Sequence, residues 1–289
     1  MDWEVLALTR DGCPAGFREE RGKCVLVVPD QWKAFKSKRV LRQEGYSCGV
    51  QERKEKVFVV CDKLLQDKQF IRDKYRDTTP DKILEKIYNH IGNRGHSFGR
   101  DGFRILVDLL ADQEGLTHTK HPELKKELGE MLFAYRTLAR DNPKDYLGGL
   151  VTNQELGNKS LCQNFTPTPI TEMMAQMTFG TPKDMMDLVR RNSGEPIRLL
   201  EPAMGTGAMV IAANNYVPED IPLEIHGIEL DQLIYKAALV NMAIMARHPY
   251  KFICADTLAL DPNDGRAWMH ANKWDPPNMS RFYMGADSR

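Results

Sequence analysis

The fold of this chain is decided by residues 197–213, which read Ile-Arg-Leu-Leu-Glu-Pro-Ala-Met-Gly-Thr-Gly-Ala-Met-Val-Ile-Ala-Ala. A short apolar run ends in Glu201, passes the turn Gly205-Thr206-Gly207, and enters a helix of small residues. This order is typical of a ligand loop at the carboxyl edge of a parallel sheet. Glycine suits such a turn because it adopts positive φ and lets the backbone approach a ligand.

Two further strands end in acidic residues in the same way. A strand is expected over 223–230 with Glu229 near its end, and another over 252–255 is followed by Asp256. Glu229 comes twenty-two positions after Gly207, close to the roughly 20-residue offset at which an acid meets ribose hydroxyls in nucleotide-binding units. The pattern predicts an α/β fold, doubly wound in its first half, with three acids on one sheet edge.

The cofactor is predicted from what this turn lacks. Val210 stands where a dinucleotide site needs a third small residue, and the sequence has no Gly-x-x-x-x-Gly-Lys-Ser/Thr phosphate loop. Acids rather than phosphate-binding groups dominate the predicted edge. A ligand with a ribose and an ammonium-bearing tail but no phosphates fits this edge, and S-adenosylmethionine is such a ligand.

At these residues the chain resembles the N6-adenine DNA methyltransferases of the type I restriction-modification kind. Residues 201–207 resemble the family's cofactor loop, 227–231 its ribose-binding segment and 255–258 its adenine-contacting segment, while 163–170 resemble the Phe-x-Thr-Pro segment over the methionine end. The resemblance implies a Rossmann-like S-adenosylmethionine-dependent domain. It also implies cofactor contacts from Phe165, Thr166, Pro167, Glu201, Ala203, Gly205, Gly207, Glu229, Leu230, Asp256 and Thr257.

The catalytic segment of the family is matched less well. Its members carry Asn/Asp-Pro-Pro-aromatic, where the first side chain and a proline carbonyl accept hydrogen bonds from the adenine amine and the ring stacks on the flipped base. Asp275-Pro276-Pro277 resembles this segment, but Asn278 replaces the ring. The sequence ends at Arg289, before further strands or a target-recognition domain. We therefore expect the open edge of the sheet to be covered by the N-terminal region or by a partner.

The N-terminal half is predicted to hold a small α+β domain over 1–62 and a helical region over 63–150, before the methyltransferase-like domain over 151–289. Residues 18–30 are echoed at 52–62, each a charged turn and an apolar strand ending in Asp, so two hairpins joined by a helix are expected. Helices are expected near 64–71, 79–91, 103–111, 122–139, 168–178, 181–191 and 233–245, and residues 143–166 read as a linker.

Basic residues of the N-terminal half are candidates for nucleic-acid contact. A stretch without acids from Gln31 to Gln43 interleaves cations with Trp32 and Phe35, and a glycine-rich loop over 92–101 is also basic. An ordinary solvated helix face is the alternative. The predicted DNA-contacting residues are Lys33, Lys36, Lys38, Arg39, Arg42, Arg94 and Arg100.

The composition and the first residues predict the cellular compartment. The 289 residues carry no net charge, and the acidic start with no long apolar segment after it predicts a cytoplasmic protein without a signal peptide or membrane span. Six cysteines without a Cys-x-x-Cys pair favour buried thiols over a metal site.

Two functional hypotheses follow. The first is a DNA adenine-N6 methyltransferase, perhaps one that needs partner subunits. The second is a methylase-like protein that binds cofactor without catalysis and acts as an anti-restriction or assembly factor.

Overall fold

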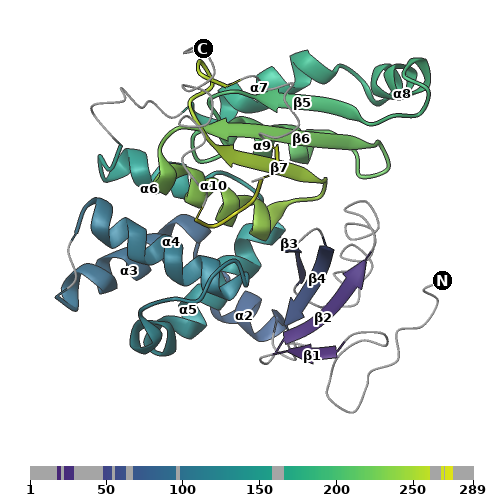
Figure 1. Ribbon diagram of the computed structural model, residues 1–289. Helices are drawn as coiled ribbons and strands as arrows, with labels where there is room; N and C mark the ends of the chain where they lie inside the picture. Colours follow the sequence, from purple (N-terminus) through teal and green to yellow (C-terminus); the bar gives the residue numbers. More distant parts are fainter. Residues whose placement is uncertain are drawn as a thin grey trace, which may run out of the picture.

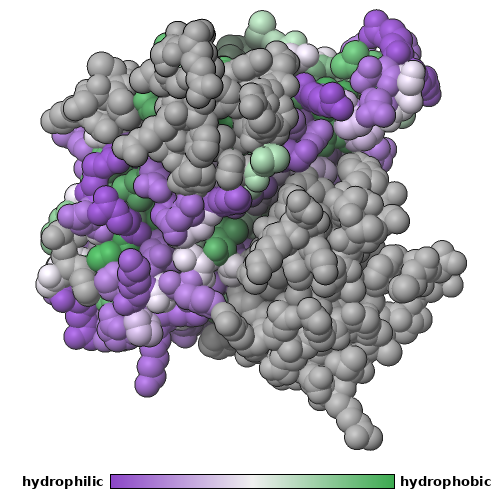
Figure 2. All heavy atoms as spheres, viewed as in Figure 1, coloured by the Kyte–Doolittle hydropathy of each residue, from purple (hydrophilic) through white to green (hydrophobic). Residues whose placement is uncertain are grey.

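The computed structural model describes residues 18–20, 23–28, 48–53, 56–62, 68–95, 98–157, 166–260, 268–269 and 271–275, with side chains from residue 71 onward. An antiparallel sheet, a group of helices and a parallel sheet follow one another along the chain (Figure 1). Within these ranges, no helix has both the length and the apolar character needed to span a membrane. Hydrophilic residues dominate the described surface in Figure 2, and hydrophobic ones form small separate patches.

The N-terminal sheet consists of two hairpins. It contains β1 (Arg18–Glu20), β2 (Lys23–Val28), β3 (Cys48–Arg53) and β4 (Lys56–Asp62) in the order β1-β2-β4-β3, and all neighbours are antiparallel. The two strands of the sequence echo, β2 and β4, pair with each other, with Val25 opposite Val60. The two predicted hairpins are confirmed. The stretch expected to join them, including Lys33, Lys36, Lys38, Arg39 and Arg42, lies outside the described residues.

The helical region contains α2 (Lys68–Lys74), α3 (Pro80–Asn93), α4 (Arg100–Gln113), α5 (Pro122–Asp141) and α6 (Tyr146–Asn153). The three-to-four spacing of Ile83, Ile87 and Ile91 predicts one apolar face of α3, and all three side chains are fully buried. The prediction of a linker over 143–166 is wrong for α6. Its Tyr146, Leu147 and Val151 are buried in the core, so this short helix is held by packing despite its two glycines.

The C-terminal part carries the parallel sheet. Its elements are α7 (Thr168–Phe179), α8 (Pro182–Arg191), β5 (Ile197–Glu201), α9 (Ala208–Tyr216), β6 (Leu223–Glu229), α10 (Gln232–Met245) and β7 (Tyr250–Cys254). The strands run in parallel in the order β5-β6-β7, as the strand–helix alternation predicts. This confirms the α/β class for this part of the chain.

The helical region and the parallel sheet share one hydrophobic core. Helix α10 lies between the sheet and helices α4 and α5 (Figure 1). It is buried on all sides, and its Ile234 and Val240 belong to the same cluster as Phe103 of α4 and Tyr135 of α5. The domain boundaries expected near residues 62 and 150 stay predictions, but packing is continuous across residue 150.

The outer edge of β7 is covered by the chain itself. The Asn272 side chain accepts from the Phe252 N–H at 2.8 Å and donates to the Tyr250 carbonyl at 2.9 Å. The Asn272 backbone N–H donates to the Phe252 carbonyl at 2.7 Å. One asparagine therefore satisfies backbone groups of β7 that a neighbouring strand would otherwise bond.

A charged cluster on the parallel sheet makes stability depend on pH. The Glu224 carboxylate on β6 lies 3.0 Å from Lys251 Nζ and 3.2 Å from His226 Nε2. The proximity of His226, followed by that of Lys251, lowers the pKa of Glu224 from 4.5 to about 2, against the opposing effect of burial. The native state therefore binds the proton less readily than the unfolded chain.

We expect Glu224→Gln to reduce the free energy of unfolding by about 2 kcal/mol at pH 7, a figure discounted for the partial exposure of the cluster. The stabilisation is complete above pH 4.5 and is lost as the pH falls toward 2. Urea unfolding of wild type and variant at several pH values measures it, with Glu195→Gln as control. A difference between wild type and Glu224→Gln that stays constant down to pH 3 would contradict the assignment.

Candidate functional site at the carboxyl edge of the parallel sheet

The glycine turn after β5 has the backbone that the sequence predicts. Gly205 has φ 57° and Gly207 has φ 100°, both in the left-handed region. The Met204 N–H donates to the Ile228 carbonyl at 3.0 Å, which fastens the turn to β6. The Met204 side chain lies over Gly227, where a β-carbon would come within 2.4 Å of its sulfur. The glycine in β6 therefore makes room for the turn.

Glu229, at the end of β6, organises this edge. Its Oε2 accepts from the Gly205 N–H at 3.0 Å and its Oε1 accepts from the Asp231 N–H at 2.8 Å. The residue is only 8% exposed. Burial raises the pKa of its carboxyl, and the N–H groups of Asp231 and Gly205 oppose that rise. A carboxylate has about four acceptor positions, so both oxygens can accept further hydrogen bonds from a ligand.

The loops after β5 and β7 meet beside Glu229. The Thr257 hydroxyl donates to the carbonyl of Pro202. Asp256 accepts from the Leu258 N–H at 3.0 Å, and Glu201 accepts from the Ala203 N–H at 3.3 Å. Leu230, next to Glu229, is exposed and adds an apolar side chain to this edge. The structure thus brings together the predicted residues of the cofactor loop, the ribose-binding segment and the adenine-contacting segment.

The segment expected over the methionine end is described only in part. Phe165 lies outside the described residues, while Thr166 and Pro167 are exposed immediately before α7. Helix α7 packs against α9, the helix that leaves the glycine turn. Thr166 and Pro167 are therefore carried by the element that packs on the helix of the cofactor loop.

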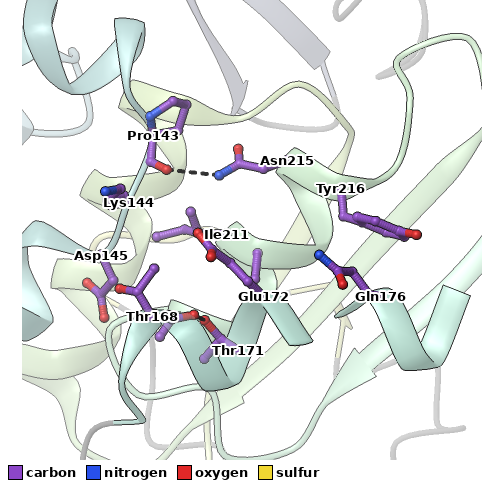
Figure 3. A pocket seen from close by; sticks show the side chains of 12 residues that line it. Pro143, Lys144, Asp145, Thr168, Thr171, Glu172, Gln176, Ile211, Asn215 and Tyr216 are labelled. Atoms are coloured by element: carbon purple, nitrogen blue, oxygen red, sulfur yellow. Dashed lines mark hydrogen bonds between the residues drawn. The ribbon is translucent and has the colours of Figure 1, made fainter. Parts of the chain in front are cut away.

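A pocket of about 240 Å³ lies between α7, α9 and the connection from α5 to α6. Figure 3 shows side chains of α7 and α9 on its walls and the hydrogen bond from Asn215 to the Pro143 carbonyl, which is 2.9 Å long. The pocket touches the first residue of α9, Ala208, but not Glu201, Glu229 or Asp256. It is thus a neighbour of the predicted cofactor edge and not that edge itself.

The predicted catalytic segment begins beyond β7, at the edge of the sheet opposite to β5. Asp275 is 78% exposed in its side chain, and its Oδ1 lies 2.7 Å from Nζ of Lys236 on α10. Lys236 also lies 4.7 Å from the ring centroid of Trp274. Pro276 and Pro277 lie outside the described residues. Because Asn272 binds the outer edge of β7, Asp275 follows a segment that lies three strand spacings from β5, roughly 14 Å.

The two described basic candidates are both engaged with acids. Arg94 lies 2.9 Å from Glu127. Arg100 lies 2.7 Å from Asp231, whose side chain is 6% exposed, and it also donates to the Leu156 carbonyl at 3.1 Å. Asp231 in turn caps α10 by accepting from the Leu233 N–H. Arg100 thus joins α4 to the predicted ribose-binding segment, and DNA contact by either arginine stays a prediction.

Sequence reasoning missed one contact at the glycine turn. The hydroxyl of Thr206 donates to Asp145, which precedes α6, at 2.5 Å. Asp145 is also the N-cap of α6, where its side chain accepts from the Gly148 N–H. The one local signal in the sequence is therefore an N-cap aspartate three residues before Gly148. Nothing local points to Thr206, because the two residues are 61 positions apart.

An open parallel sheet with a glycine turn after one strand and an acid at the end of the next places this part of the chain in the α/β class. The sequence comparison is more specific. Residues 148–283, slightly less than half of the chain, match the family model of N-6 DNA methylases, which confirms the resemblance drawn from the motifs.

Solved structures give weaker likenesses. A class I S-adenosylmethionine-dependent methyltransferase from Listeria monocytogenes, described as putative, is 15% identical with a TM-score of 0.43, and the match covers 64% of this chain and 55% of that one. A type I restriction-modification methyltransferase subunit from Streptococcus thermophilus is 20% identical with a TM-score of 0.31, over 63% of this chain and 40% of that one. The chain thus spans about half the length of these proteins. Among curated proteins, no sequence matches it.

Proposed function

We propose that this chain binds S-adenosylmethionine at the carboxyl edge of β5, β6 and β7 as a DNA adenine-N6 methylase-type protein. The observation that carries the proposal is Glu229, a buried carboxylate that holds the Gly205 N–H while its remaining acceptor positions are available to a ribose. The family match over 148–283 supports it. When bound, the cofactor would supply an activated methyl group.

The residues present fit this ligand. Glu229 would accept from the ribose hydroxyls, Asp256 from the adenine amine, and exposed Leu230 would pack on the adenine ring. Gly205 and Gly207 would let the backbone approach the ligand, with Glu201, Ala203 and Thr257 around them. Phe165, Thr166 and Pro167 would close over the methionine end. The carboxylates at this edge accept hydrogen bonds, and they suit a ligand with hydroxyls and an ammonium group, which carboxylates bind by charge-assisted hydrogen bonds.

DNA is the proposed substrate, and partner subunits of a restriction-modification system are the proposed assembly. Both are expected in the cytoplasm. Contact with phosphates would come from Lys33, Lys36, Lys38, Arg39 and Arg42, together with Arg94 and Arg100.

A second candidate function is cofactor binding without efficient transfer. Asp275 would accept from the target amine, with Pro276 and Pro277 shaping that contact, yet Asp275 is paired with Lys236 at 2.7 Å. Asn278 has no ring to stack on an unstacked base, and such stacking contributes about 1–3 kcal/mol per base. These two features favour an anti-restriction, assembly or regulatory role.

We expect the isolated chain to bind cofactor but to methylate DNA feebly. The measurement is tritiated methyl incorporation into adenine-rich DNA by wild type, Asp275→Ala and Asn278→Phe, with cofactor binding checked by calorimetry for each. Restoring the ring should raise incorporation if its absence limits transfer. Robust turnover by wild type that disappears in Asp275→Ala would overturn the non-catalytic candidate. Absence of cofactor binding by wild type would overturn the proposal as a whole.

A further inference from the structure

A partly buried hydrogen-bond network joins the helical region to the glycine turn. Asp145 stands between α5 and α6. Its Oδ2 accepts from the Thr206 hydroxyl at 2.5 Å, and its Oδ1 accepts from Asn241 Nδ2 at 2.8 Å and from the Gly148 N–H at 2.9 Å. One carboxylate therefore connects α6, the turn after β5, and α10.

Thr206 is the middle residue of the Gly-x-Gly turn and is 1% exposed. Its side chain is held by Asp145, and its carbonyl accepts from Asn241 Nδ2 at 2.9 Å. Thr206 is thus held through both its side chain and its backbone carbonyl, while the N–H of the preceding Gly205 is held by Glu229. The turn is held between two acids, one of which is predicted to touch the ligand.

Gly148 is the residue that makes this contact possible. A β-carbon there would lie 2.1 Å from Asp145 Oδ2 and 2.5 Å from Thr206 Oγ1. Only glycine leaves the space in which the two oxygens meet. The helix carries this glycine at a cost in helix propensity of about 1 kcal/mol, which is consistent with a requirement for the contact.

The carboxylate at this position is costly. Burial raises the pKa of Asp145 above its ordinary value, while the hydrogen bonds from Thr206, Gly148 and Asn241 oppose the rise. All three partners are donors, so an amide in place of the carboxylate would turn an N–H group toward donors. Hydrogen bonds that converge on one carboxylate in this way strengthen one another where the local dielectric is low, and they make a local conformation more rigid.

We propose that Asp145 is a positioning residue that presets the glycine turn for its ligand, so that the connection between α5 and α6 controls affinity at the cofactor edge. The inference rests on the proposed function for the identity of the ligand. It assigns to the helical region a part in ligand binding through Thr206, without contact of its own with the ligand.

The test compares S-adenosylmethionine affinity in wild type, Asp145→Asn, Thr206→Val, Thr206→Ser and the double variant Asp145→Asn/Thr206→Val. We expect each of the first two single variants to weaken binding about tenfold. The double variant should be little weaker than Asp145→Asn alone, because Thr206→Val acts through the hydrogen bond that Asp145→Asn already perturbs. Thr206→Ser keeps the hydroxyl and should bind like wild type.

The matched control is Asp108→Asn. Asp108 also accepts from a threonine hydroxyl, that of Thr119 at 2.6 Å, but on α4 away from the turn. This variant should lower the melting temperature without changing affinity. Unchanged affinity in both Asp145→Asn and Thr206→Val would overturn the proposal, and so would an equal loss of affinity in Asp108→Asn. If Asp145→Asn does not fold, Thr206→Val and Thr206→Ser decide alone.

Amide hydrogen exchange separates this inference from the proposed function. Exchange at residues 205–207 should quicken in Thr206→Val relative to wild type without any ligand, whereas exchange in Asp108→Asn should stay as in wild type there. Faster exchange in a protein that does not bind S-adenosylmethionine would overturn the assignment of this ligand and support the positioning role of Asp145. Unchanged exchange would overturn the positioning role whatever the ligand is.

Discussion

Gly205→Val should abolish binding of S-adenosylmethionine. Gly205 has φ 57°, a conformation that a β-branched residue adopts only at a cost of about 1–3 kcal/mol. The valine side chain would also occupy the space in which the ligand is proposed to approach the protein backbone. The Gly205 N–H would at the same time shift away from Glu229, which it now meets at 3.0 Å. Calorimetry with millimolar cofactor measures the loss.

Gly194→Val is the matched control. Gly194 also has positive φ, 84°, but it precedes β5 at the amino end of the sheet, and a β-carbon there would meet nothing within 4 Å. Its substitution should cost similar stability and leave binding intact. Binding by Gly205→Val at wild-type affinity would remove the glycine turn from the proposed site. Loss of binding in Gly194→Val as well would show that backbone strain alone accounts for the effect.

Glu229→Ala should weaken cofactor binding by about 1.5–3 kcal/mol, the scale of charge-assisted hydrogen bonds to hydroxyl groups. This corresponds to a rise in Kd of roughly 10- to 150-fold. Because Glu229 also accepts from Gly205 and Asp231, thermal melting must accompany calorimetry. Glu229→Gln keeps the shape and one acceptor oxygen and should lie between alanine and wild type.

Glu195→Ala controls for the removal of an acid. Glu195 is exposed and lies before β5, at the sheet end opposite Glu229. It should bind cofactor as wild type does. Equal affinity in Glu229→Ala and Glu195→Ala would refute the proposed role of Glu229 even if the protein binds S-adenosylmethionine.

The elements that the sequence predicted are those with a local, periodic signal. Ile83, Ile87 and Ile91 recur at helical spacing and are buried in α3. The three acid-ending strands form the parallel sheet because each apolar run is short and bounded by turn residues. Glu201, Glu229 and Asp256 share an edge for the topological reason that parallel strands end on the same side.

What the sequence could not predict depends on contacts between distant residues. The sequence predicts a linker at α6 because Gly148 and Gly149 weaken its helical pattern, and the reason for glycine at position 148 is its close approach to Asp145 and Thr206. The ion pair of Arg100 has no local signal either, because its partner Asp231 is 131 positions away, and the predicted phosphate contact of Arg100 stays a prediction. The motif spacing predicts a catalytic role for Asp275, and no local pattern indicates that its carboxylate pairs with Lys236 of α10. Nor does any local pattern indicate that Asn272 binds the edge of β7. Each of these contacts forms between elements that only tertiary packing brings together.

Asn272 gives the sheet a further property. A parallel strand with free N–H and carbonyl groups is a template on which an extended segment of another molecule can add, and long uncovered edges promote aggregation. By bonding Tyr250 and Phe252 through a side chain and its own backbone, one residue interrupts that template in the middle of β7. Among the described residues, this single asparagine therefore hinders β-augmentation on this side of the sheet without a strand beside β7.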